Sequence, residues 1–142
     1  MIIPMIRSFA AGCVLGGAML LPAMALAAPV TLAATLDGAN EPAGGDPDGT
    51  GSFTVEIDAD AGDFCYTLKG AKIAAPTAAH VHSGAAGVEG PPVITMHVAD
   101  DECMAVEPEV LKPIVASPAD YYVNIHTADF PKGAVRGQLA KK

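Results

Sequence analysis

The sequence of 142 residues contains no tryptophan, few other aromatic residues and few basic side chains. Three tyrosines and four phenylalanines accompany eight lysines and arginines, against sixteen aspartates and glutamates. Such a chain has no basic patch to neutralise phosphates and no aromatic platform on which the bases of a single strand can stack. We therefore expect no nucleic-acid partner.

Charge is missing altogether from residues 8–21, an apolar stretch near the N-terminus. A short segment with one positive charge, Arg7, precedes it, and the small-x-small triplet Ala25-Leu26-Ala27 follows it. This order is typical of a cleaved signal peptide, and the apolar stretch is too short for a membrane span. We predict cleavage after residue 27, a periplasmic or secreted protein, and no membrane span in the remaining chain. Lipid attachment at Cys13 is the alternative, although almost no apolar sequence precedes that residue.

Residues 28–142 are predicted to form a single acidic domain with an all-β fold. They carry a net charge of −9, and clusters of glycine and proline separate stretches in which apolar and polar residues alternate. A period of two is typical of β-strands, and short strands between turns favour a Greek-key β-sandwich or barrel. The predicted strands cover residues 30–36, 53–58, 64–68, 79–82, 93–98, 121–127 and 134–139. Residues 107–116 are either a short helix or a loop, because Pro108, Pro113 and Pro118 limit the length of any helix there.

Cysteine is scarce, and the spacing of the cysteines rules out the commonest metal motif. After removal of the signal peptide only Cys65 and Cys103 remain, and no Cys-x-x-Cys spacing occurs. Two cysteines in an oxidising compartment predict a disulfide between them. A pair of thiolate ligands to a metal is the alternative, and the missing motif disfavours it.

The histidines carry the main functional signal. His80 and His82 are two residues apart in a predicted strand, so both rings project from the same face of the sheet. In the predicted strand 121–127, His126 shares a face with Asn124, while the alternate residues face the core. If the two strands are close, three imidazoles converge, and such a set with one open position suits copper or zinc.

The same residues have a metal-free interpretation. The rings of His80 and His82 would then make hydrogen bonds that pin the following glycine-rich loop, and His126 would cap the end of its strand. Asn124 would either orient a metal ligand or bridge two strands.

Long, ordered motifs link the chain to a known family. The segment Ala79–Val93 resembles the central motif of the CHRD domain, first named from chordin. Tyr121–Thr127 and Gly133–Leu139 resemble the closing motifs of that family, so the resemblance covers residues 30–140. It implies an exported protein with an immunoglobulin-like β-sandwich, but it does not supply a biochemical role.

A more distant resemblance concerns the metal. The order of His-Val-His, a glycine-rich loop, a later strand with histidine and a Gly-x-Arg-Gly segment is similar to copper–zinc superoxide dismutase, a Greek-key barrel. That resemblance implies that His80, His82 and His126 are copper ligands, with His97 as a bridging histidine. It also implies that Arg136 lies beside the copper and guides anions. No further histidine cluster stands for the zinc subsite of that family.

These observations lead to one principal hypothesis and two alternatives. We expect an exported, non-enzymatic CHRD-type protein that binds a transition metal, copper before zinc, through a histidine cluster. The first alternative is a metal-free extracellular interaction module, for which the sequence names no protein partner. The second alternative is a copper-dependent dismutase-like enzyme.

Overall fold

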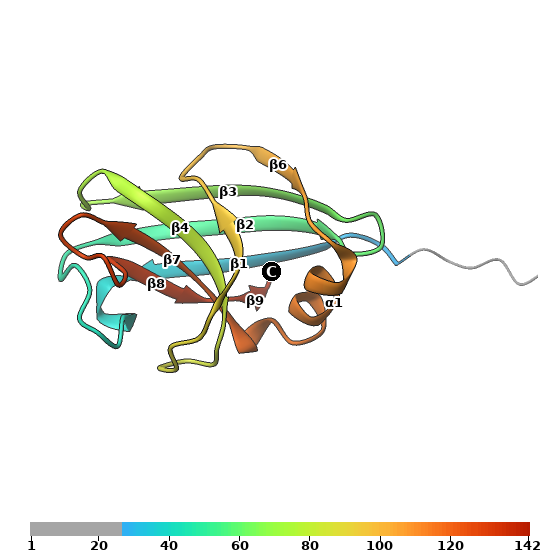
Figure 1. Cartoon of the computed structure of the whole chain (residues 1–142). Helices are drawn as coiled ribbons and strands as arrows, with labels where there is room; N and C mark the ends of the chain where they lie inside the picture. Colours follow the sequence, from blue (N-terminus) through green and yellow to red (C-terminus); the bar gives the residue numbers. More distant parts are fainter. Residues whose placement is uncertain (1–26) are drawn as a thin grey trace, which may run out of the picture.

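The computed structural model describes residues 27–142, and β-strands make up most of this part of the chain (Figure 1). The predicted signal peptide, residues 1–27, lies outside the described residues apart from Ala27 and stays a prediction. The strands are β1 (Val30–Asp37), β2 (Thr50–Asp58), β3 (Asp63–Ala71), β4 (Pro76–Ser83), β5 (Pro92–Met96), β6 (Glu102–Ala105), β7 (Tyr121–Thr127), β8 (Val135–Gln138) and β9 (Ala140–Lys141). The helix α1 (Pro108–Ala116) and two 3-10 turns, η1 (Gly38–Asn40) and η2 (Pro118–Asp120), complete the described elements.

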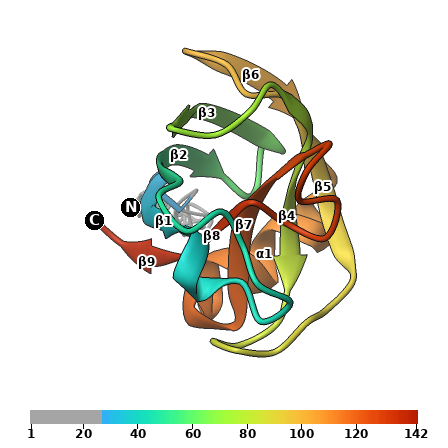
Figure 2. The same ribbon diagram turned by 90° about the vertical axis from the view of Figure 1, so that its left-hand side faces the viewer.

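All strands belong to one antiparallel sheet, in the order β5-β4-β7-β8-β1-β2-β3-β6, with β9 beside β1. The sheet curls into a half-barrel, so that its two halves face each other (Figure 2). The halves join where Asp37 of β1 pairs with Arg136 of β8. The connections β3–β4, β5–β6 and β6–β7 cross from one half to the other, as long connections do in Greek-key folds. The predicted all-β fold is confirmed, in the form of one curled sheet.

The core lies between the two halves and follows from the alternation in the strands. Every second residue is buried over residues 53–57 of β2 and 64–68 of β3, and the rings of Phe53, Phe64 and Tyr66 pack together with centroids 5.6–6.3 Å apart. Tilted aromatic pairs at such distances add stability beyond the area that they bury. Leu111 and Ile114 on one face of α1 are fully buried and join the same core.

Of the two alternatives for residues 107–116, the structure has the helix, since Pro108 occupies the first turn, where a missing N–H costs little. Two other details differ from the sequence-based expectation. Strand β6 was not predicted, because its four residues lie between an acidic loop and a proline. Strand β5 ends at Met96, so that His97 lies beyond it. Among the described residues no helix combines the length and the apolar character needed to cross a membrane.

The predicted disulfide is confirmed. Cys65 of β3 and Cys103 of β6 are direct partners in the strand register and are covalently bonded. Strand β6 ends the order of the sheet, so the bond ties a short edge strand to the core strand β3.

Candidate metal centre

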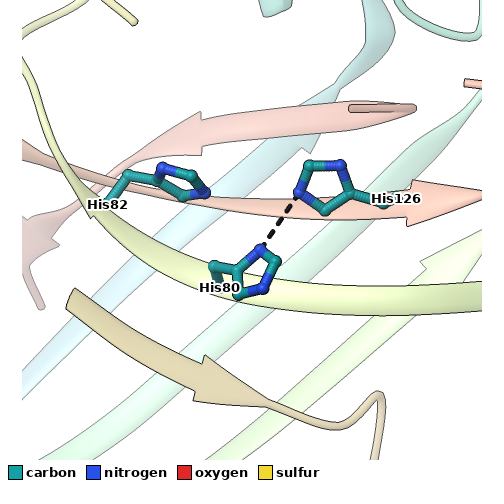
Figure 3. Close-up of side chains that lie close together, drawn as sticks. All are labelled: His80, His82 and His126. Atoms are coloured by element: carbon teal, nitrogen blue, oxygen red, sulfur yellow. Dashed lines mark hydrogen bonds between the residues drawn. The ribbon is translucent and has the colours of Figure 1, made fainter. Parts of the chain in front are cut away.

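Three histidines converge on the outer face of the β4–β7 pair. His80 and His82 lie on β4 and His126 on the neighbouring β7, and the intervening Val81 is fully buried in the core. The three rings point toward one another (Figure 3). One ligand nitrogen from each ring lies within 4.8 Å of those of the other two. The expected convergence of these histidines therefore occurs in the structure.

Backbone carbonyls fix the orientation of two of the rings. The Nδ1 atom of His82 lies 2.8 Å from the carbonyl oxygen of Gly90, and that of His126 lies 3.1 Å from the oxygen of Pro131. A carbonyl oxygen only accepts, so each Nδ1 carries the proton and donates it. This leaves the lone pair of each ring on Nε2, as in metal-binding histidines, whose second nitrogen donates to a carbonyl or carboxylate.

The third ring completes a set of three nitrogen donors. His80 Nδ1 lies 3.1 Å from His126 Nε2, a contact that a shared proton makes favourable in the metal-free protein. His82 Nε2 is buried and has no hydrogen-bond partner within the described residues. Unsatisfied buried groups are rare, and a bound ion is one of their regular explanations. The donor set is thus His80 Nδ1, His82 Nε2 and His126 Nε2.

The spacing of these nitrogens is close to that of a metal site. Because metal–nitrogen bonds are ~2.0–2.1 Å long, the ligating nitrogens of two imidazoles on one ion lie at most ~4.2 Å apart. The contact between His80 and His126 already satisfies this limit, and the largest separation of 4.8 Å needs a closure of less than ~1 Å.

The electrostatics keep the rings available for a metal. Burial lowers the pKa of His80 below its usual 6.5, and the neighbouring His126 and His82 lower it further. Burial also lowers the pKa of His82, although its hydrogen bond to Gly90 opposes the shift. Both imidazoles are therefore neutral at pH 7, and only neutral imidazole binds metals.

Arg136 and Tyr122 pack next to the ring of His82 and the glycine-rich loop. Arg136 is 2% exposed, and its Nη2 donates to the carbonyl oxygens of Ala85 and Val88 at 3.0 and 2.9 Å. Its guanidinium carbon lies 3.4 Å from the centroid of the Tyr122 ring. The ring of His82 stacks on Tyr122, with centroids 4.8 Å apart and planes 7° from parallel. Arg136 thus holds the glycine-rich loop in place and contributes to a stack that includes a candidate ligand.

Arg136 does not occupy the solvent-facing position beside the metal that the dismutase resemblance implied. A side chain that guides anions from solvent must face solvent, whereas this guanidinium is buried under the loop of residues 84–91. Its contact with the ligand set is indirect, through the loop and through Tyr122.

His97 lies outside the cluster. Its side chain is 83% exposed, and its Nδ1 is 3.5 Å from a carboxylate oxygen of Glu102. Its backbone N–H donates to the hydroxyl of Tyr66 on β3. The bridging position that the resemblance implied for His97 is therefore not found next to the other three histidines.

Two buried polar residues lie next to the cluster. Asn124, for which the sequence leaves open whether it orients a ligand or bridges two strands, is directly opposite His80 in the strand register and is 2% exposed. Glu41 was not predicted, and it is also buried. Burial raises the pKa of Glu41, while the charge of Arg136 and a hydrogen bond from Asn124 oppose the shift. No pattern in the turn-rich segment around residue 41 distinguishes this acid from its exposed neighbours.

Comparison with known proteins identifies the family. The chain matches the family described as CHRD domain over residues 32–139. No curated protein and no solved structure gives a significant match, so the resemblance to superoxide dismutase is not confirmed. CHRD domains are found in extracellular or secreted proteins, and the disulfide fits such a location. Because the match covers well over half of the sequence and includes every candidate ligand, the chain belongs to the CHRD domain family.

Proposed function

We propose that this protein is exported to the periplasm or the cell exterior, and that it binds one transition-metal ion through His80, His82 and His126. Copper is the preferred metal, and zinc is the second choice. The observation that carries the proposal is the convergence of three imidazole nitrogens, two of them on rings that are oriented by backbone carbonyls.

The chemistry of the donors favours copper. Imidazole suits copper and zinc, whereas magnesium and calcium prefer oxygen ligands, and copper heads the affinity order of the divalent first-row metals. The cysteines do not compete for the ion, since both are held in the disulfide on β3 and β6. When bound, copper supplies one-electron redox chemistry, and the role of the chain is to hold and orient it.

The surroundings favour binding over catalysis. The net charge of the acidic domain repels anions such as superoxide. The nearby guanidinium of Arg136 is engaged with loop carbonyls and does not face the solvent. A non-enzymatic role as a metal-binding protein therefore accounts for the site better than a dismutase does.

A competitive copper titration of the mature protein tests the proposal. We expect one copper ion per chain in the wild type, and affinity at least about tenfold lower in His80→Ala and His126→Ala. His97→Ala is the matched control, because it removes an exposed imidazole outside the cluster and should leave the affinity unchanged.

Thermal melts of the same proteins without metal distinguish the proposed metal site from the metal-free alternative. That alternative assigns the rings a purely structural role, as hydrogen-bond donors to loop carbonyls. It predicts no stoichiometric copper uptake by the wild type, and a clear loss of stability in His80→Ala and His126→Ala. That pair of results would refute the proposed function.

A further inference from the structure

Asn124 has an unusual position beneath the three histidines. It projects from the same face of β7 as His126, two residues away, and its partner on β4 is His80. It is 2% exposed, and its Oδ1 atom is buried without a hydrogen-bond partner in the part of the chain that the structure describes. An amide oxygen buried in this way normally has a partner, because its desolvation costs ~1–3 kcal/mol.

A second unpartnered atom belongs to His82, two residues along β4 from the strand partner of Asn124. His82 donates from Nδ1 to Gly90, so that its buried Nε2 has only a lone pair to offer. Asn124 Oδ1 also has only lone pairs. Two buried electron-pair donors on neighbouring strands are unfavourable unless a proton or a cation satisfies them.

Glu41 sets the direction of the Asn124 amide. A carboxylate accepts hydrogen bonds only, so its partner on Asn124 is the NH₂ group, and this bond opposes the rise in the pKa of Glu41. The NH₂ group therefore faces Glu41, and the buried Oδ1 is left without a partner of its own.

The backbone around Glu41 leaves it little freedom. A Cβ at position 133 would collide with Glu41 Oε1, so the side chain fits only because glycine occupies that position. On the other side, the neighbouring Asn40 donates from Nδ2 to the carbonyl oxygen of Arg136 at 3.1 Å, which anchors the segment to β8.

We propose, building on the metal site above, that Asn124 Oδ1 is the fourth donor to the ion, and that Glu41 is the positioning residue that turns this oxygen toward it. The site then has three nitrogen donors and one oxygen donor. An oxygen ligand stabilises Cu(II) relative to Cu(I), because oxygen is the harder donor. With this position occupied, a four-coordinate ion has no open coordination position for a substrate, in agreement with a non-enzymatic role.

The electron paramagnetic resonance spectrum of the Cu(II)-loaded mature protein tests this inference. Asn124→Leu removes the oxygen at similar volume, and we expect a changed spectrum, a higher copper reduction potential and about tenfold weaker Cu(II) binding. Glu41→Leu should change the spectrum in the same direction. Thr127→Val is the matched control: it removes a buried hydroxyl of the same strand that bonds to the backbone of Phe130, and it should leave the spectrum unchanged.

The outcomes separate the two proposals. If the wild type takes up no copper, the proposed function fails, and this inference fails with it. If the wild type binds copper through imidazoles and Asn124→Leu keeps its spectrum and potential, only the role of Asn124 is overturned. If Asn124→Leu does not fold, Asn124→Asp replaces it: a carboxylate at a coordinating position lowers the potential and alters the spectrum, and an unchanged spectrum would overturn the inference.

Discussion

Replacement of Arg136 tests how the site is supported. The guanidinium donates two hydrogen bonds to the glycine-rich loop and packs on Tyr122, and its charge opposes the rise that burial causes in the pKa of Glu41. Arg136→Leu removes all of these interactions at once. It also leaves two loop carbonyls without their donor.

The structure sets the size of the expected loss. Hydrogen bonds from a charged donor contribute about 1.5–3 kcal/mol each, and two of them are lost. Burial of the leucine side chain offsets part of this, so we expect a loss of about 4 kcal/mol in the free energy of unfolding. Arg136→Lys keeps the charge but loses the planar fork and the stacking, and we expect a loss of about 2 kcal/mol.

Urea unfolding of the metal-free variants measures these losses, and copper titration measures the effect on the site. Release of the loop frees the carbonyl of Gly90 that orients His82, so copper affinity should fall about tenfold in Arg136→Leu. Lys69→Met is the control, since Lys69 forms an exposed ion pair with Asp100 and should change stability by less than ~0.5 kcal/mol. A loss below ~1 kcal/mol in Arg136→Leu would refute the supporting role of this guanidinium.

Two further predictions concern stability. Replacement of Cys65 and Cys103 by alanine should lower the free energy of unfolding by about 4 kcal/mol, because the disulfide closes a loop with a sequence separation of 38 and so reduces the chain entropy of the unfolded state. Denaturant melts that show a loss below ~1 kcal/mol would contradict this. The pKa values of His80 and His82 are lowered by folding, so their contribution to the stability of the metal-free protein is present above pH 6.5 and is lost as the pH falls through their folded pKa values. Urea melts between pH 8 and pH 4 should show this decline, and it should be weaker in a His80→Gln, His82→Gln double variant; an equal decline in both proteins would contradict it.

The sequence was sufficient for those features that depend on local periodicity. Alternation in β4 places His80 and His82 on one face, and the alternation in β7 places His126 and Asn124 on the polar face of the next strand. The pairing of Cys65 with Cys103 followed from their number and from the expected compartment.

Features that depend on tertiary packing could not be predicted. The burial of Arg136 results from the loop that folds over it, and a Gly-x-Arg-Gly segment gives no sign of whether its arginine faces solvent or a carbonyl. Glu41 is buried because a distant glycine, Gly133, leaves room for its carboxylate. His97 lies away from the cluster because β5 ends one residue before it, and strand ends are poorly defined by composition.

X-ray absorption at the copper edge of the loaded mature protein tests the central claim most directly. The multiple scattering from imidazole rings counts histidine ligands, and it does not depend on affinity or stability. The account predicts three imidazoles with copper–nitrogen distances of ~2.0 Å in the wild type, and two in His126→Ala. A wild-type spectrum with fewer than three imidazoles, or the same number of imidazoles in both proteins, would contradict it.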